Sequence, residues 1–297
     1  MVMGLSQTYV VQIQTVKSGF YYITLLKRRV MAIKIEDSLQ TQDPFKLVIY
    51  GDNGTGKSSL MEKHGLFYNY EDGIRYLNCK QVRLVGEPLE ATTEASQYIF
   101  KNAKELLKQH SCLVIDSLDF LEKTIIDSVC KEKNVSSIGD IKWGAGYQMV
   151  SNKWREFLNS MDHLRKAGFN IVFICHAQIV KINNPNLEEY DMWNLKLQKN
   201  TASYIAEWSD FLGMVCHDVF TVQQQKKFGE MKYKPGTSGR RVIKFGHNPS
   251  YASKSRLPLP DEVDLNWEAF LSAVAQARAD GNSAKTGNNQ QTGNNNE

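Results

Sequence analysis

An early glycine-rich stretch, "YGDNGTGKSSL" (50–60), has the residue types and spacing of a phosphate-binding loop. The glycines of a G-x-x-x-x-G-K-S pattern let successive backbone N–H groups point at phosphate oxygens. The lysine reaches the β- and γ-phosphates, and the serine hydroxyl takes one position on Mg²⁺. We therefore predict that ATP phosphates are bound by Gly51, Asp52, Asn53, Gly54, Thr55, Gly56, Lys57, Ser58 and Ser59.

A second chemical group is the carboxylate that ends the apolar run "CLVID" (112–116). This run reads as a buried strand, expected in the sheet next to the strand before the phosphate loop. Asp116 at its end would bind Mg²⁺ together with Ser58. The plainer alternative is that Asp116 caps the following helix, but Ser117 and Asp119 are equally good caps and leave it free.

Hydrolysis of a bound triphosphate also needs a base that orients water. Many P-loop motors place a glutamate directly after the metal aspartate, where this chain has Ser117. The best remaining candidate is Glu71 in "LFYNYEDG", after a second strand-like run (65–70), with Asp72 as its neighbouring alternative. The alternative is that both residues are ordinary solvent-exposed carboxylates of a loop, with no catalytic role.

Two polar residues stand at the carboxyl end of the third strand-like run, "NIVFICH" (170–176), where a γ-phosphate would be sensed. His176 and Gln178 therefore join Glu71 and Lys57 in the predicted catalytic set. An ordinary edge histidine is the alternative for His176.

Guanine specificity is not expected, because the only candidate for an N-K-x-D reader, "SNKWRE" (151–156), lacks the aspartate. A kinase for a small metabolite is a remaining alternative. Its arginine-bearing lid would come from Arg240 and Arg241.

The elements that must position these groups alternate along the chain, which indicates an α/β fold with a mainly parallel sheet flanked by helices. Further strands are predicted over 46–50 and 211–216, and helices over 93–109, 120–133 and 147–164. After residue 217, "KPGTSG" is the predicted turn of a C-terminal β-hairpin extension. The predicted parts are an N-terminal extension with two strand-like segments (1–44), the core (45–260), a helix (261–279) and a disordered tail (280–297).

The 297-residue composition is that of an ordinary globular protein, with a net charge of +4. Its five cysteines form no C-x-x-C pattern, which favours a reducing cytoplasm over a disulfide framework or a zinc site. No apolar run approaches the roughly 18 residues needed to cross a bilayer, so no membrane role is expected.

Residues 223–256 contain nine Lys or Arg side chains and one acidic residue, with aromatic residues interleaved. A groove that binds single-stranded nucleic acid needs cations that contact the phosphate backbone and aromatic rings on which bases stack. The alternative is a basic hairpin that is simply solvated. The residues of this segment predicted to bind DNA are Lys226, Lys227, Lys232, Arg240 and Arg241.

The motifs "YGDNGTGKSSL", "LFYNYEDG", "CLVIDSLDFL", "KWGAGYQMVSNKW", "VFICHAQ", "EWSDFLGMV" and "YASKSRLPLP" resemble, in this order, phage RecA-core nucleotide-binding proteins. The resemblance covers about residues 45–260. It implies a RecA-like P-loop NTPase fold in which the strand 65–70 lies beside the phosphate-loop strand. It also implies that Glu71 is the catalytic glutamate, Asp116 the metal aspartate and His176 the sensor. RecA itself has Asn-Gln where this chain has His-Ala, which puts the coupling of ATP to DNA in doubt.

In RecA-like proteins the DNA-facing loops follow the metal strand and the sensor strand, here residues 134–147 and 181–199. Lys142 and Trp143 make the loop 134–147 a reasonable candidate for DNA binding. Lys254 and Arg256, in "KSR", are candidates for fingers that reach a neighbouring subunit's γ-phosphate, or for DNA or surface contacts.

We therefore expect a Mg²⁺- and ATP-dependent ATPase that binds single-stranded DNA in phage recombination or single-strand annealing. The resemblance implies a homo-oligomeric ring or filament in the host cytoplasm, with a phage or host single-strand binding protein as a further partner. The alternatives are a DNA-pairing scaffold with little nucleotide turnover, and the small-molecule kinase.

Overall fold

The computed structural model describes residues 9–15, 21–27, 43–71, 73–185, 187–225 and 231–291. The chain divides into two units, residues 1–40 and 41–297. In the first, β1 (Tyr9–Thr15) and β2 (Tyr21–Lys27) pair antiparallel, with Val11 opposite Leu25. Both strands fall in the segments where the sequence predicts them.

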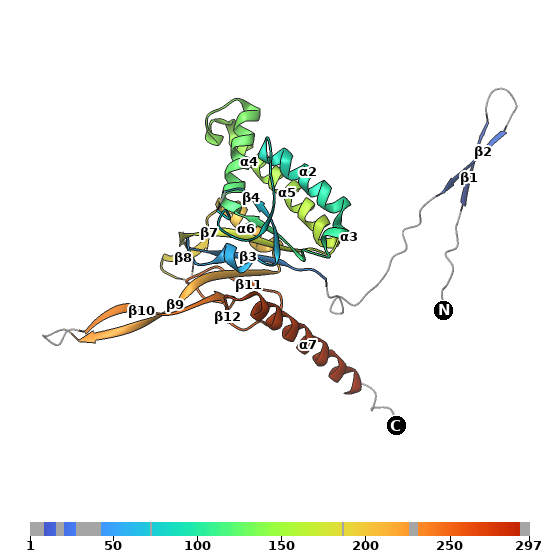
Figure 1. Cartoon of the computed structure of the whole chain (residues 1–297). Helices are drawn as coiled ribbons and strands as arrows, with labels where there is room; N and C mark the ends of the chain where they lie inside the picture. Colours follow the sequence, from blue (N-terminus) through green and yellow to red (C-terminus); the bar gives the residue numbers. More distant parts are fainter. Residues whose placement is uncertain are drawn as a thin grey trace. The chain divides into compact units, whose positions relative to one another are not determined.

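The second unit is built on a ten-stranded sheet (Figure 1). Six neighbouring strands run parallel in the order β5-β4-β6-β7-β3-β9. Their bounds are β3 (Lys46–Gly51), β4 (Gly65–Asn69), β5 (Lys80–Val82), β6 (Cys112–Asp116), β7 (Asn170–Ile182) and β9 (Phe211–Gln225). Antiparallel strands add to this frame: β8 (Tyr190–Leu195), β10 (Met231–Lys244), β11 (Lys254–Ser255) and β12 (Glu262–Asp264).

The strand order corrects two expectations about neighbours. β7 lies between β3 and β6, and β4 lies beyond β6, so neither the metal strand nor the strand before Glu71 adjoins the phosphate-loop strand. β7 takes the central place because residues 171–175 are all buried, which suits a strand covered on both faces. Parallel strands still bring their carboxyl ends to one edge, so the chemical groups gather there.

Helices cover both faces of the sheet, as the alternating pattern predicts. Two apolar cores lie on opposite faces, because successive strand residues point to opposite sides. On one face lie α2 (Pro88–Lys101), α3 (Ala103–Leu106), α4 (Leu118–Lys133), α5 (Ala145–Lys166) and α6 (Lys199–Trp208), and on the other lie α1 (Lys57–Leu60) and α7 (Trp267–Gln291) (Figure 1).

The C-terminal helix is part of the core unit. Trp267, Phe270 and Val274 of α7 are buried, and the Phe270 ring contacts the rings of Phe45 and Phe211 edge-on. The helix continues to Gln291, whereas the sequence predicts disorder from residue 280. Once this packed turn has nucleated the helix, each further residue adds a hydrogen bond without a new nucleation cost.

β9 and β10 form the predicted hairpin, but its turn was misplaced. The "KPGTSG" segment (234–239) lies inside β10, where the register shifts between Thr237 and Arg241. Gly239 supports this bulge with a φ of 78°. The residues that connect the two strands, 226–230, lie outside the described ones.

Much of the segment 181–199 belongs to a second hairpin rather than to an irregular loop, and its contact with DNA stays a prediction. β7 continues past the sheet to Ile182, and β8 pairs with that continuation, with Ile179 opposite Trp193. Among the helices in the described residues, none is long and apolar enough to cross a membrane.

Candidate active site

The phosphate loop connects β3 to α1. Gly54 and Gly56 have φ values of 76° and 94°, a conformation that favours glycine, and a Cβ at Gly51 would lie 2.2 Å from the Val215 carbonyl oxygen. The Lys57 ammonium donates to the carbonyl oxygens of Gly51 (2.9 Å) and Asp52 (2.7 Å). Burial lowers the pKa of Lys57, although nearby carboxylates oppose the effect. Lys57 is thus held at the loop, as its motif predicts.

Ser58 and Asp116 meet although β7 separates their strands. The Ser58 hydroxyl donates to Oδ2 of Asp116 at 2.6 Å, and Asp116 is 1% exposed. Burial raises the pKa of Asp116 to about 6, because the charged form loses its hydration. A cation would restore the stability of that form, and a carboxylate with a hydroxyl oxygen is a suitable ligand pair for Mg²⁺, which binds few protein groups beside substrate phosphates. The two residues therefore fit a magnesium site.

Glu71 lies on the same cleft as Lys57 and Asp116. Its Oε2 accepts a hydrogen bond from the Ser117 hydroxyl at 2.9 Å, and the Ser117 residue is fully buried. The sequence offers Ser117 as a possible cap of α4, and it stands at the N-cap position, but its side chain makes no capping bond there. It orients the carboxylate instead. Asp72, the alternative base, lies outside the described residues.

His176 lies between two carboxylates at the end of the buried part of β7. Its Nδ1 is 2.9 Å from Oδ2 of Asp119 and 4.0 Å from Oε2 of Glu71. The His176 backbone N–H donates to the other oxygen of Asp119 at 3.2 Å. Asp119, like Ser117, therefore serves the site rather than the helix cap that the sequence suggests.

The pKa shifts of this pair favour its charged form. The hydrogen bond with Asp119 raises the pKa of His176 against the opposing effect of burial. Burial alone would raise the pKa of Asp119, but the hydrogen bonds and charge of His176 outweigh it and lower that pKa. Asp119 therefore stabilises the protonated form of His176 next to Glu71 and the phosphate loop.

The cleft around these groups has a volume of about 560 Å³. Phosphate-loop residues Asn53, Gly54 and Gly56–Ser59 line it, and Asp52 and Thr55 support the loop through a 2.9 Å hydrogen bond between the Thr55 hydroxyl and the Asp52 carbonyl oxygen. Tyr76, Phe120 and Arg241 also line the cleft. Sequence reasoning missed Tyr76 and Phe120 altogether, because exposed aromatics in loops and helix starts carry no motif.

Gln178 is not brought to the site. Its side-chain amide donates to the carbonyl oxygens of Leu195 (2.8 Å) and Leu197 (2.9 Å). It therefore fastens β7 to β8 and the segment after it. The prediction failed because β7 extends beyond the sheet edge, which carries position 178 away from the phosphates.

The predicted DNA contacts are spread over the molecule. Lys142 and Trp143 are exposed in the turn before α5. Lys226 and Lys227 lie outside the described residues, and Lys232 lies in β10. Arg240 pairs with Asp264, whereas Arg241 turns to the phosphate loop, so these two neighbours do not form one basic surface.

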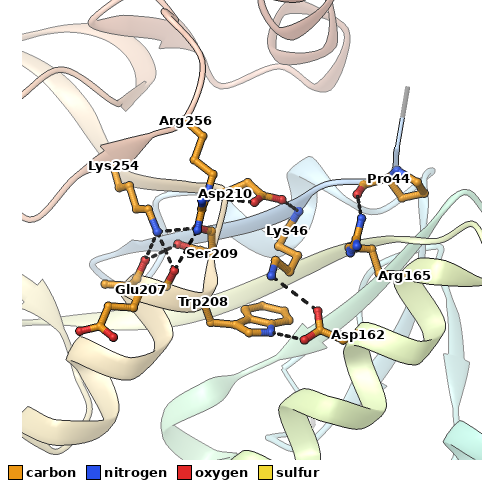
Figure 2. Close-up of polar contacts among 11 residues, drawn as sticks. Pro44, Lys46, Asp162, Arg165, Glu207, Trp208, Ser209, Asp210, Lys254 and Arg256 are labelled. Carbon is orange, nitrogen blue, oxygen red and sulfur yellow. Dashed lines mark hydrogen bonds and ion pairs between the residues drawn. The ribbon is translucent and has the colours of Figure 1, made fainter. Parts of the chain in front are cut away.

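Lys254 and Arg256 are engaged within their own chain (Figure 2). The Lys254 ammonium donates to the carbonyl oxygens of Ala206, Glu207 and Ser209, each at 2.7 Å, at the end of α6. Arg256 pairs with Asp210 at 3.3 Å. Because Lys254 lies opposite Leu212 at the start of β9, both are at the sheet edge away from the phosphate loop. These contacts favour a structural role, and the finger hypothesis stays a prediction.

The same sheet edge carries further polar contacts between α5, α6 and the start of β3 (Figure 2). Asp162 accepts a hydrogen bond from the Trp208 indole at 3.1 Å and pairs with Lys46 at 3.5 Å. Arg165 donates to the Pro44 carbonyl oxygen at 3.0 Å. These contacts tie α5, α6 and the start of β3 together at the sheet edge away from the phosphate loop.

Comparison with known proteins supports this description. The family described as an AAA domain matches residues 43–257, a span that contains the phosphate loop, Glu71, Asp116 and His176. None of the curated proteins matches the chain.

Two solved structures show remote likeness to this chain. A KaiC-like protein from the archaeon Pyrococcus horikoshii is 11% identical over 75% of this chain and 85% of its own, with a TM-score of 0.35. The flagellar accessory protein FlaH from Methanocaldococcus jannaschii is 10% identical over 75% and 84%, with a TM-score of 0.32. We attach no functional meaning to likenesses this remote.

The family match covers well over half of the chain, and the fold and the phosphate loop agree with it. The sheet is mostly parallel, helices flank it, and the nucleotide-binding groups gather at its carboxyl edge. The chain belongs to the AAA domain family, with the fold and nucleotide-binding site of a RecA-like P-loop ATPase.

Proposed function

We propose that this protein hydrolyses ATP with Mg²⁺ and acts on single-stranded DNA, in phage recombination or single-strand annealing. The observation that supports hydrolysis is the placement of Glu71 on the phosphate cleft, with its carboxylate fixed by the Ser117 hydroxyl. Attack by water requires a base that is held in a fixed orientation, so that it can accept the water's proton.

The residues of the cleft divide the work of hydrolysis. The loop N–H groups and Lys57 bind the phosphates, and Glu71 orients a water molecule and accepts its proton. His176, whose protonated form Asp119 stabilises, faces the charge that develops on the transferred phosphoryl group. Mg²⁺ held by Ser58 and Asp116 would offset phosphate charge.

Support for single-stranded DNA comes from Trp143. Its residue is 99% exposed and has a φ of 61°, a left-handed conformation that costs a bulky side chain about 1–3 kcal/mol. Strain of this kind persists where a function requires it. The exposed Trp143 indole offers stacking for a base, and the exposed Lys142, its neighbour in sequence, offers a cation for a phosphate.

A DNA-pairing scaffold with little turnover would use the same surface without the base. The Ser117–Glu71 contact favours the hydrolase, since a scaffold has no need to orient a carboxylate on the phosphate cleft. We further propose a homo-oligomeric ring or filament, and a phage or host single-strand binding protein as a partner. The order of the sequence motifs supports both of these proposals.

ATP hydrolysis measured with and without single-stranded DNA tests the proposed function. We expect DNA to stimulate the wild type, and Trp143→Ala to lose about 1–3 kcal/mol of DNA binding while basal hydrolysis is unchanged. Tyr98→Ala is the matched control, because Tyr98 is 64% exposed on α2. The DNA-dependent function would be rejected if single-stranded DNA left the rate of ATP hydrolysis unchanged and no DNA binding appeared at moderate salt.

A further inference from the structure

The bulge in β10 directs one arginine toward the phosphate loop. Three residues, 238–240, stand opposite Asp218 between the pairs Thr237–Val219 and Arg241–His217. The Ser238 hydroxyl donates to Oδ2 of Asp218 at 3.1 Å, and Arg240 pairs with Asp264. Bulges re-aim side chains and are frequent next to active sites.

The Arg241 side chain contacts the phosphate loop at Thr55 and Gly56, just before Lys57. Its Nη1 donates to the Thr55 carbonyl oxygen at 3.4 Å, and a Cβ built on Gly56 would lie 2.2 Å from that same nitrogen. The guanidinium therefore lies directly against Gly56, in space that only a glycine leaves open. It lines the same cleft as Lys57 and Ser58.

The guanidinium has donors to spare. Of its five N–H groups, one contacts Thr55, and Arg241 forms no ion pair with any residue in the described part of the chain. The residue is also exposed, so the remaining donors are open to the cleft. A planar, permanently charged fork of this kind matches phosphate oxygens.

The balance of charges in the cleft favours a further cation such as the Arg241 guanidinium. Asp116 and Glu71 bring two negative charges, which offset the charge of one Mg²⁺ ion. Lys57 then faces the phosphates from the loop, and His176, which lies beside Glu71, faces the end where charge develops on the transferred phosphoryl group. A further cation on the loop side balances the triphosphate better.

We propose that Arg241 binds the phosphates of the nucleotide held by the phosphate loop of its own chain. The C-terminal hairpin thereby supplies part of the nucleotide site, through the strand that pairs with β9. This assignment replaces the predicted DNA contact at Arg241. It rests on nucleotide binding and not on DNA binding, so a failure of the DNA proposal leaves it intact.

Binding of a fluorescent ATP analogue, with tripolyphosphate as competitor, tests the assignment. Arg241→Gln removes the charge but keeps a polar, unbranched side chain at this position. We expect it to weaken both ATP and tripolyphosphate binding about tenfold or more, while the melting temperature without nucleotide is unchanged. Arg241→Lys should recover part of the loss.

Lys244→Gln is the matched control, because Lys244 lies on the same strand and pairs with Glu262 at 3.2 Å. We expect less than about a twofold change, which ordinary surface electrostatics would give. Wild-type affinity in Arg241→Gln would overturn the assignment, as would an equal loss in Lys244→Gln. A loss for ATP with none for tripolyphosphate would also overturn it, since the contact would then be with the nucleoside.

Discussion

The Ser117 hydroxyl lies 2.9 Å from Oε2 of Glu71 and donates a hydrogen bond to it across the sheet edge. Ser117 directly follows Asp116, the proposed metal ligand, at the position where many P-loop motors place the catalytic glutamate itself. In this chain the proposed base, Glu71, follows the end of β4, and the residue after β6 donates a hydrogen bond to it.

Ser117→Ala should lower kcat about tenfold and leave KM unchanged, because the lost hydrogen bond positions the base without touching the nucleotide. Steady-state ATP hydrolysis measures both constants, and Ser117→Thr should restore much of the rate. Ser151→Ala is the control, since its hydroxyl bonds only to the Tyr147 carbonyl of its own helix. A rise in KM with unchanged kcat would mean that Ser117 acts on binding.

Asp119→Asn should reduce stability most between about pH 4 and pH 6.5. The folded pKa of His176 is raised, so its contribution is present below the ordinary value of 6.5 and is lost as pH rises through the folded pKa. The folded pKa of Asp119 is lowered, so its contribution is present above 3.8 and lost as pH falls through the folded pKa. Chemical denaturation from pH 4 to pH 9 should show the difference between variant and wild type shrinking at the alkaline end. A difference that does not vary with pH would contradict an ion pair.

Asp116→Asn should abolish the strengthening of ATP binding by Mg²⁺, since one of its two protein ligands loses its charge. The same variant should be more stable than the wild type above about pH 6 without metal. The folded pKa of Asp116 is raised, so its ionisation costs stability as pH rises from 3.8 through about 6. Titration calorimetry with and without Mg²⁺, and melting curves at pH 5 and pH 8, test both parts. Unchanged Mg²⁺ dependence would place the metal elsewhere.

Lys254→Met should destabilise the protein by about 1–3 kcal/mol, because three carbonyl oxygens near the end of α6 lose their donor. Denaturant unfolding gives the loss directly. A trans-acting finger predicts instead a stable but inactive variant whose activity returns when it is mixed with Lys57→Ala subunits. That recovery would contradict the structural role.

The phosphate loop and its strand could be predicted because their residues are contiguous in sequence. Each residue type there also has one physical role, such as the backbone freedom of glycine or the charge of lysine. The two apolar cores were equally predictable, as in α5, where Val150, Trp154 and Met161 recur at helical spacing and are all buried. Ser58 and Asp116 were paired correctly even though the strand order was not. Both stand at carboxyl ends of parallel strands, which meet at one edge whatever the order between them.

The rest depends on contacts that no local pattern specifies. Arg241 reaches Thr55 across 186 residues, and only the bulge in β10 sends it there rather than toward solvent. Ser117 and Asp119 have the side chains of helix caps, and only the arrival of Glu71 and His176 gives them other partners. Gln178 was misassigned because the sequence does not show how far β7 extends.

The most direct test of the account is single-turnover hydrolysis of Mg²⁺-ATP by Glu71→Gln beside the wild type, with binding measured on the same samples. The variant should bind ATP with wild-type affinity and hydrolyse it about 10²–10⁴-fold more slowly, as expected for loss of a general base. Hydrolysis at the wild-type rate would show that the carboxylate held by Ser117 is not the base, and would leave a nucleotide-binding protein without the proposed mechanism.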